Sequence, residues 1–279
     1  MKENRASDTA LGASTVRAVH QLLDEKPLIL EDPISPLLIG QQGVRDILEH
    51  AEMQKTLPAR ALRSHIVLRS RYAEDGLLAA VESGVTQAIN LGAGYDTFPF
   101  RQPSWASELR FVEMDHPATQ RAKLEAIQRA KIPTPGNVAF FPLDLERREL
   151  ASALADADLD RSAPTFVACL GVLAYLKPET ARQVFKGVAG LAPGSHFVFA
   201  FASTPAHPRD GGTSLAARTA SLGEPWFTRF ETDKLEADLK TIGFHRVSFL
   251  DPSDASQKYY KGRSDLPAPR NTRLCTAIV

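Results

Sequence analysis

The sequence is poor in cysteine, with only 2 in 279 residues, Cys169 and Cys275. Because no Cys-x-x-Cys pair is present, the usual spacing of a structural zinc site is excluded. Both cysteines lie in apolar runs typical of buried strands, which favours free buried thiols over a disulfide. We therefore expect a protein of a reducing compartment, with a cytoplasmic location.

The sequence also lacks long apolar segments and an excess of either charge. No apolar run approaches the roughly 20 residues that a membrane helix needs, and residues 1–8 are polar, unlike the apolar core of a signal peptide. Lys plus Arg and Asp plus Glu number 33 each. No net field therefore attracts the chain to nucleic acid or to an anionic membrane, and we expect neither as a partner.

Several signatures of catalysis are absent as well. There is no His-Glu-x-x-His, no Gly-x-Ser-x-Gly and no cluster of carboxylates, and the 7 histidines are scattered along the chain. The sequence therefore predicts neither a catalytic metal nor a hydrolytic triad. An isolated histidine is assigned a structural role.

What the sequence does contain divides into two regions within one compact domain. Residues 1–84 show helical spacing of apolar residues and no strand pattern, with a glycine C-cap at Gly84. They predict a helical cap or lid over the sheet that follows. The expected helices are Ser14–Leu23, Val44–Leu57 and Leu62–Ser83, with a loop over Leu28–Leu38 that Pro33 and Pro36 interrupt.

Residues 85–279 alternate strand-like and helix-like segments, which predicts an α/β fold with a mostly parallel sheet covered on both faces. The expected strands are Gln87–Leu91, Leu109–Met114, Val138–Leu143, Thr165–Val172, His196–Ala202, Arg246–Leu250 and Leu274–Val279. The expected helices between the first five strands are Asp96–Ser107, Pro117–Lys131, Leu150–Asp156 and Pro178–Leu191.

Two segments near the C-terminus depart from this alternation. Pro252–Thr272 is too polar and too rich in proline and glycine for a crossover helix, so we expect the last strand to be antiparallel, at or near the sheet edge. An irregular insertion at about 203–230 follows a central strand. A long loop in that position is where an α/β protein builds its substrate side.

The stretch Thr86–Phe98 organises the predicted fold. An apolar strand ends there in Gly92-Ala93-Gly94, and the following strand ends in Asp115. Adjacent parallel strands with these endings form a nucleoside-binding crevice, because a ligand can approach a glycine turn closely and a carboxylate accepts bonds from a ribose diol. Asp115 has an alternative role as the cap of the helix that Pro117 opens, and His116 is another candidate for that cap.

The glycine turn lacks the third glycine of a dinucleotide fingerprint, since Thr97 stands in that position. This argues against NAD or FAD and favours a nucleoside ligand without a pyrophosphate. A turn that merely links a strand to a helix is the alternative.

Further candidates follow the third and fourth strands. Asp144 is placed to accept a hydrogen bond from an adenine amino group, with Leu145 against the ring, or else to cap the next helix. Tyr175 lies just past the fourth strand, where it is either a wall or donor of the pocket or a core residue.

Two arginines, Arg69 and Arg71, lie on the long helix before the glycine strand. A guanidinium is the natural partner of a bound carboxylate. The alternative is ordinary helical ion pairing with Glu74 and Asp75.

Together these residues resemble the leucine carboxyl methyltransferase family of S-adenosylmethionine-dependent enzymes. The similarity runs from about Thr15 to the end of the chain. The motifs that carry it are Arg69-Ser-Arg-Tyr-Ala-Glu-Asp, Asn90-Leu-Gly-Ala-Gly-Tyr-Asp-Thr, Val112-Glu-Met-Asp-His-Pro, Leu143-Asp-Leu, Gly171-Val-Leu-Ala-Tyr-Leu and Gly223-Glu-Pro-Trp.

The resemblance implies a class I methyltransferase fold, Rossmann-like, with seven strands of which the last is antiparallel. It implies that the cofactor carboxylate meets Arg69, that the methionine part lies along Gly92–Gly94, and that Asp115 holds the ribose. Asp144 and Leu145 would hold the adenine. One departure is Leu170, which stands near the cofactor where relatives often carry glutamate.

The expected activity is transfer of a methyl group from S-adenosylmethionine to an oxygen, most simply a carboxylate of a small molecule, which is already ionised near neutral pH. Tyr175, Arg71 and His207 are the expected residues on the acceptor side, and His207 is the candidate base for a phenolic acceptor. A protein carboxylate is another possible acceptor. An NAD-dependent oxidoreductase and a non-catalytic module that binds the cofactor are the more distant alternatives.

Overall fold

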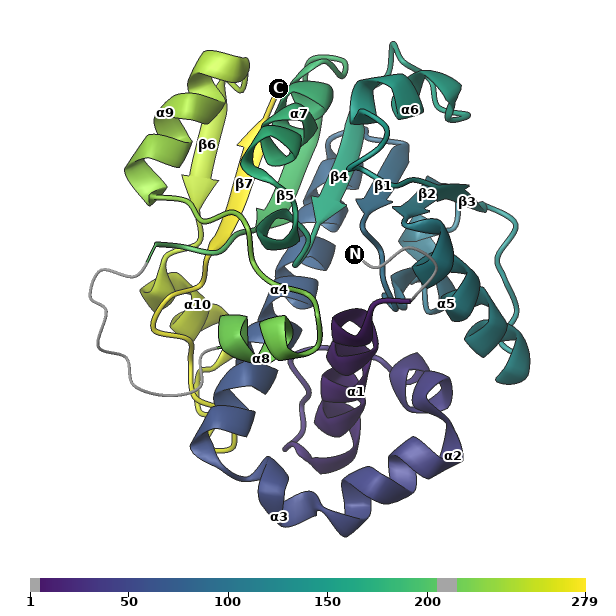
Figure 1. The fold of residues 1–279 in the computed structure, drawn as a ribbon, viewed down its shortest axis with the longest axis vertical. Helices are drawn as coiled ribbons and strands as arrows, with labels where there is room; N and C mark the ends of the chain where they lie inside the picture. The colour runs from purple at the N-terminus through teal and green to yellow at the C-terminus, as the bar shows by residue number, and fades with distance from the viewer. Residues whose placement is uncertain (1–5, 205–214) are drawn as a thin grey trace.

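The computed structural model describes residues 6–204 and 215–279, so His207 lies outside the described residues. The described residues form one seven-stranded sheet with the strand order β3-β2-β1-β4-β5-β7-β6 (Figure 1). The strands are β1 Gln87–Leu91, β2 Arg110–Asp115, β3 Val138–Pro142, β4 Thr165–Cys169, β5 His196–Ala200, β6 Arg246–Phe249 and β7 Leu274–Ile278.

The first five strands are parallel to their neighbours, whereas β7 is antiparallel to both β5 and β6. This confirms the α/β fold, the seven strands and an antiparallel last strand. β7 lies one place in from the edge, which β6 forms. Every residue of β1 and of β4 is buried, as expected of central strands covered on both faces.

Helices cover both faces of the sheet, and each face has its own apolar core. The helices α6 (Leu150–Asp156), α7 (Pro178–Ala189) and α9 (Thr232–Ile242) pack against Leu91, Met114 and other residues of one face. The helix α4 (Leu57–Glu82) packs on the opposite face, where Phe166 and Val198 point. Figure 1 shows α4 behind the sheet and the other three helices in front of it.

The helix α4 approaches the sheet closely because Gly76 has no side chain. A Cβ at this position would lie 3.2 Å from Val198 Cγ2. The helix starts at Leu57, earlier than expected, because a proline in the first turn loses no internal hydrogen bond. It ends as predicted at Gly84, whose N–H bonds to the carbonyl oxygen of Val81 at 2.9 Å.

Three further helices precede α4: α1 (Asp8–Leu23), α2 (Ile34–Glu49) and α3 (Ala51–Gln54). The expected loop over Leu28–Leu38 is wrong beyond Pro33, because Pro36 falls in the first turn of α2, where it is tolerated. The expected helix Val44–Leu57 is divided among α2, α3 and α4. The division of the chain into 1–84 and 85–279 stays a prediction.

Other expectations are corrected after the glycine turn and near the C-terminus. The expected helix Asp96–Ser107 is wrong, since two prolines leave only the 3₁₀ turns η1 (Phe98–Phe100) and η2 (Ser104–Ala106). Pro252–Thr272 holds no crossover helix, as expected, because β7 is antiparallel to β6, but it does contain one short helix that was not predicted. A short helix α10 (Pro252–Tyr259) begins at Asp251, whose carboxylate accepts from Ser253 N at 2.7 Å.

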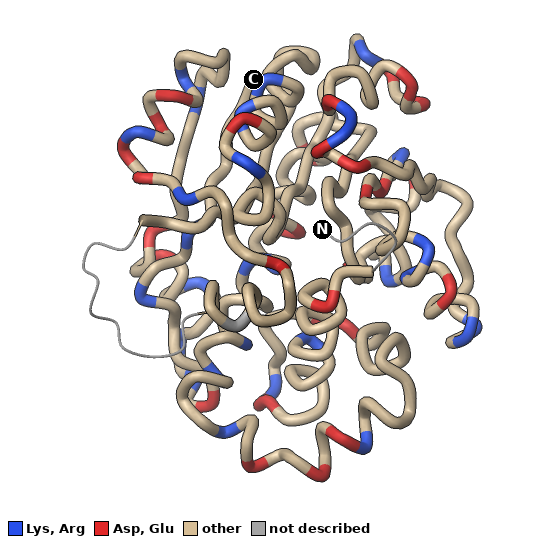
Figure 2. Tube along the Cα trace, in the orientation of Figure 1, with Lys and Arg blue, Asp and Glu red and all other residues tan. Residues whose placement is uncertain are grey.

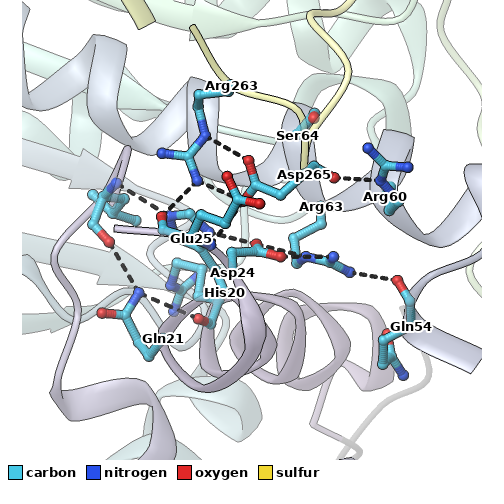
Figure 3. A network of polar contacts seen from close by, with 12 residues as sticks. His20, Gln21, Asp24, Glu25, Gln54, Arg60, Arg63, Ser64, Arg263 and Asp265 are labelled. Atoms are coloured by element: carbon cyan, nitrogen blue, oxygen red, sulfur yellow. Dashed lines mark hydrogen bonds and ion pairs between the residues drawn. The ribbon is translucent and has the colours of Figure 1, made fainter. Parts of the chain in front are cut away.

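A polar network joins the end of α1 to α4 and to the loop after α10 (Figure 3). Arg63 on α4 holds the carboxylate of Asp24 with two bonds of 2.7 and 2.8 Å. Asp265, in the loop after α10, accepts from the backbone N–H of Glu25 at 2.9 Å, and Arg263 pairs with Asp265 at 2.6 Å. These contacts fix the end of α1 against α4 and the C-terminal segment.

Acidic and basic residues are interspersed along the described part of the chain (Figure 2). Both cysteines are free and buried, on β4 and β7. None of the helices in residues 6–204 and 215–279 has the length and apolar character needed to cross a membrane.

Candidate functional site

A cavity of about 450 Å³ opens at the carboxyl ends of β1, β2 and β4. Its floor is made by the residues that end these strands, and its walls come from α1, α4 and the segment around α8 (Leu215–Ser221). It is lined by most of the predicted site residues, namely Arg69, Gly92, Ala93, Gly94, Asp115, Asp144, Leu145, Leu170 and Tyr175.

Glycine is required at positions 92 and 94, both by the backbone conformation and by the closeness of neighbouring atoms. Gly92 and Gly94 have φ angles of 68° and 53°, in the left-handed region. A Cβ on Gly92 would lie 2.2 Å from Val172 Cγ2, and one on Gly94 would lie 3.1 Å from Ala10 Cβ. The turn therefore passes tightly between the segment after β4 and the first turn of α1.

The carboxylate of Asp115 faces this turn. It accepts hydrogen bonds from Gly94 N at 2.5 Å and from His116 N at 2.6 Å. Burial raises the pKa of the Asp115 carboxyl, and the two N–H donors partly offset that effect. His116, not Asp115, caps α5 (Pro117–Arg129), because its ring nitrogen accepts from Ala118 N at 3.3 Å. Asp115 thus remains directed into the cavity.

No α-helix begins at the end of the glycine turn. Thr97, in the place of a third fingerprint glycine, is fully buried and is followed by the 3₁₀ turn η1. The row of N–H groups at a helix start, which a pyrophosphate requires, is therefore missing here. This geometry argues against a dinucleotide.

Asp144 and Leu145 line the cavity on the side of β3. Asp144 accepts from Glu146 N at 3.0 Å and lies 3.6 Å from His116 Nε2. It does not cap α6, which begins at Leu150 after Glu149. The alternative role as a helix cap is therefore wrong.

Arg69 reaches the cavity over the backbone of Gly171. A Cβ at Gly171 would lie 2.5 Å from Arg69 Nη1, so the glycine makes room for the guanidinium. Burial lowers the pKa of Arg69 to about 10, while Tyr175 and Asp96 act in the opposite direction. No carboxylate of the described residues forms an ion pair with Arg69, and its charge is left to face the cavity.

The structure does not bring Arg71 into the site. Its side chain is 44% exposed and pairs with Asp75 at 2.8 Å on the same helix. The expected role of Arg71 in acceptor binding is corrected, because a shift of two residues along a helix turns the side chain away from the cavity.

Tyr175 and Leu170 are both cavity residues. The Tyr175 ring meets the Trp226 ring edge to face, with centroids 6.5 Å apart. Leu170 packs partly against the apolar residues of α4. The wall near them is thus apolar, with the tyrosine hydroxyl as its polar group.

Sequence reasoning missed Glu224 as a wall residue. Its carboxylate accepts from the backbone N–H of Asp8 at 2.9 Å, from Ser7 Oγ at 3.0 Å and from Thr9 Oγ1. An acid at a helix N-terminus is favourable, and here it ties α1 to the segment after α8. The motif Gly223-Glu-Pro-Trp marked this segment in the sequence, but it did not indicate that Glu224 contacts the start of α1.

A buried ion-pair network supports the glycine turn from behind. Arg17 of α1 donates to the backbone carbonyl of Tyr95 at 2.5 Å and to the Asp32 carboxylate at 2.9 Å. Arg101 lies 3.5 Å from the other oxygen of Asp32 and pairs with Glu74. Although burial opposes it, the charges of Arg17 and Arg101 hold the pKa of Asp32 below its usual value.

Comparison with known proteins agrees with this geometry. The model of the leucine carboxyl methyltransferase family matches residues 10–189. YktD of Bacillus subtilis (strain 168), provisionally named an S-adenosyl-L-methionine-dependent methyltransferase, is 29% identical over 290 residues and the match covers 95% of each chain.

Two solved structures share the fold. A provisionally named methyltransferase from Thermobifida fusca has a TM-score of 0.59 at 18% identity, covering 99% of this chain and 95% of that one. A DUF574 family protein from Streptomyces avermitilis has a TM-score of 0.58 at 17% identity, covering 96% of this chain and 95% of that one. The class I methyltransferase fold of this chain is thereby established.

Proposed function

The chain belongs to the leucine carboxyl methyltransferase family, and from this premise we propose that it methylates a carboxylate of a small molecule. It is a methyltransferase whose cofactor is S-adenosylmethionine. The observation that carries the proposal is one cavity with three complementary features: the glycine turn, the Asp115 carboxylate and the unpaired Arg69 guanidinium.

These residues fit the cofactor by chemistry. Arg69 is a cation without an ion pair among the described residues, and it suits the carboxylate of the methionine part. Asp115 has a carboxylate able to accept bonds from the two ribose hydroxyls, beyond those from Gly94 and His116. Asp144 and Leu145 offer an acceptor for the adenine amino group and an apolar surface for the ring.

When bound, the cofactor supplies a methyl group on a sulfonium, which is a good leaving group. The chain then has to align the acceptor oxygen with that methyl carbon and to exclude water. Positioning of this kind contributes up to about 7–11 kcal/mol without acid or base catalysis. Tyr175 and the α8 segment are the residues we assign to the acceptor side, while Leu170 stays assigned to the cofactor side.

The choice of a carboxylate acceptor rests on the chemistry of the wall. A carboxylate is ionised at neutral pH and needs no base, whereas a phenol with a pKa near 10 does. Among the described cavity residues, Asp115 accepts from two backbone N–H groups, His116 from Ala118 N and Glu224 from Asp8 N, and we assign none of them as a base for the acceptor.

The test is methyl transfer from labelled S-adenosylmethionine to a library of carboxylic acids, with an alkaline step after the reaction. A methyl ester releases volatile labelled methanol in alkali, whereas a phenolic ether retains its label. Base-labile product supports the proposal. Stable product means a hydroxyl acceptor, and cofactor binding without any product means a non-catalytic module.

A further inference from the structure

Two buried hydrogen-bond donors have no partner, and one of them belongs to a residue that contacts the cavity wall. They are Arg273 Nε and Trp226 Nε1, and the only other buried unpartnered side-chain atom in the described residues is Ser14 Oγ. An unsatisfied buried donor costs about 1–3 kcal/mol, and more when it carries charge. Both donors therefore call for an acceptor that the described residues do not supply.

Arg273 is held in a strained backbone conformation at the start of β7. Its φ is 53°, in the left-handed region that residues with a side chain rarely adopt. Its carbonyl oxygen accepts from Phe201 N at 3.1 Å, which fixes Arg273 beside the carboxyl end of β5. Such strain is typical of functional positions.

Arg229 connects Arg273 with Trp226. Its guanidinium carbon lies 5.2 Å from the centre of the Trp226 ring, and its Nη1 donates to the carbonyl oxygen of Ser203 at 3.4 Å. Its charge also lowers the pKa of Arg273, after the larger effect of burial. Trp226 in turn contacts Tyr175, a residue of the cavity wall. Trp226 thus lies against a residue of the cavity wall, and Arg229 lies next to Trp226.

Arg229 and Arg273 have no acidic partner among the described residues. No ion pair joins Arg229 or Arg273 to a carboxylate of the described residues, although acids and bases are balanced in the whole chain. His65 on α4 is held neutral here: burial, then the charges of Arg69 and Arg273, lower its pKa to about 3.

We propose that Arg273 and Arg229, with the indole N–H of Trp226, bind an anionic group of the methyl acceptor that is separate from the methylated carboxylate. The acceptor is then at least a dianion, such as a dicarboxylate. This inference rests on the proposed function, because it assigns the second end of the same substrate. An anion satisfies both orphaned donors and offsets the unpaired charge. Binding at this remote group orients the reacting end.

The experiment uses the full chain saturated with S-adenosylhomocysteine and titrates succinate, glutarate and adipate against butyrate, pentanoate and hexanoate, in which a methyl group replaces the second carboxylate. Calorimetry and the fluorescence of Trp226 report binding, and Trp226→Phe assigns the fluorescence, since the chain has 2 tryptophans. We expect at least one diacid to bind about tenfold more tightly than the monocarboxylate of the same length, as loss of a charge-assisted bond predicts. In Arg273→Gln this preference falls below about threefold, and Arg273→Lys restores part of it.

Arg246→Gln is the matched control, because Arg246 is an exposed arginine of β6. Equal binding of diacids and monocarboxylates, no binding of any diacid, or an unchanged preference in Arg273→Gln overturns the inference. If Arg273→Gln does not fold, Arg229→Gln, which changes an exposed residue, gives the same readout. Titration of S-adenosylhomocysteine alone tests the proposed function separately. If the wild type gives no binding heat with this ligand, the proposed function is refuted, whatever the result with the diacids.

Discussion

At the scale of single residues, the site depends on an unpaired charged side chain and on glycines that leave room for it and for a ligand. Arg69 is a guanidinium without an ion pair among the described residues, and Gly171 makes room for it. The sequence predicted Arg69, Asp115 and Asp144 because each follows or precedes a recognisable strand. It did not separate Arg69 from Arg71, since the orientation of a helix about its own axis depends on tertiary packing.

Arg69→Gln removes the proposed partner of the cofactor carboxylate. We expect S-adenosylhomocysteine to bind about 10- to 100-fold more weakly, because a hydrogen bond to a charged group contributes about 1.5–3 kcal/mol. Calorimetry measures the change. Arg71→Gln on the same helix is the control and should bind within about twofold of the wild type. Equal losses in both variants would contradict the assignment.

Gly92→Ala tests the tight glycine turn. The new Cβ meets both an unfavourable φ and Val172, so we expect the free energy of unfolding to fall by about 2–4 kcal/mol. Urea denaturation gives this value. Val172→Ala in the same chain should recover part of the loss, because it removes the steric term and leaves the strain. A Gly92→Ala protein as stable as the wild type would refute the turn geometry.

At the scale of helices and strands, the sequence predicted all seven strands, and it failed mainly where proline was given too much weight. Pro36 and Pro58 fall in first turns, and Pro252 opens α10, so none of them breaks a helix. The helix α9 carries Leu235 and Leu239 at helical spacing, but it was not predicted either. The position of α1 at the cavity depends on long-range contacts with Glu224 and Asp32, which no local pattern reveals.

Glu224→Gln tests whether the contact between α1 and the α8 segment closes the cavity. The variant keeps the size of the side chain but loses the negative charge at the start of α1. We expect S-adenosylhomocysteine to bind about tenfold more weakly, equivalent to about 1.4 kcal/mol, and proteases to cleave near α1 faster. Glu231→Gln, an exposed glutamate before α9 without a capping bond, is the control. If both variants behave alike, Glu224 does not hold the wall.

At the scale of the whole molecule, the fold brings segments from both ends of the chain to one cavity and its rim. The end of α1, the helix α4 and the loop after α10 are joined by polar contacts (Figure 3). The fold class, the seven strands with an antiparallel last strand and the cofactor follow from sequence pattern and resemblance, whereas the strand order was not predicted. The cations at Arg229 and Arg273 were not predicted, since two residues 44 positions apart meet only through the pairing of β5 with β7.

The stability of the molecule should depend on pH through His65. Its pKa is lowered to about 3 in the folded state, below the usual 6.5, so the unfolded chain takes up a proton that the folded chain does not. Its stabilising contribution is present above pH 6.5 and is lost as the pH falls towards 3. The free energy of unfolding should therefore decrease by up to about 1.4 kcal/mol per pH unit in this window.

Urea denaturation of the wild type and of His65→Gln at several pH values between 6.5 and 4.5 measures this contribution. The variant should show the shallower pH dependence, and His245→Gln, at an exposed position, should match the wild type. Identical slopes in wild type and His65→Gln would mean that His65 titrates normally.

The central claim is that the glycine turn and Asp115 hold one adenosyl group in the cavity. Calorimetric titration of S-adenosylhomocysteine into the wild type and into folded Asp115→Ala tests it most directly. We predict one site of micromolar affinity in the wild type, corresponding to about 8 kcal/mol, and no measurable binding in the variant. Absence of saturable heat in the wild type, or unchanged affinity in Asp115→Ala, would contradict the claim.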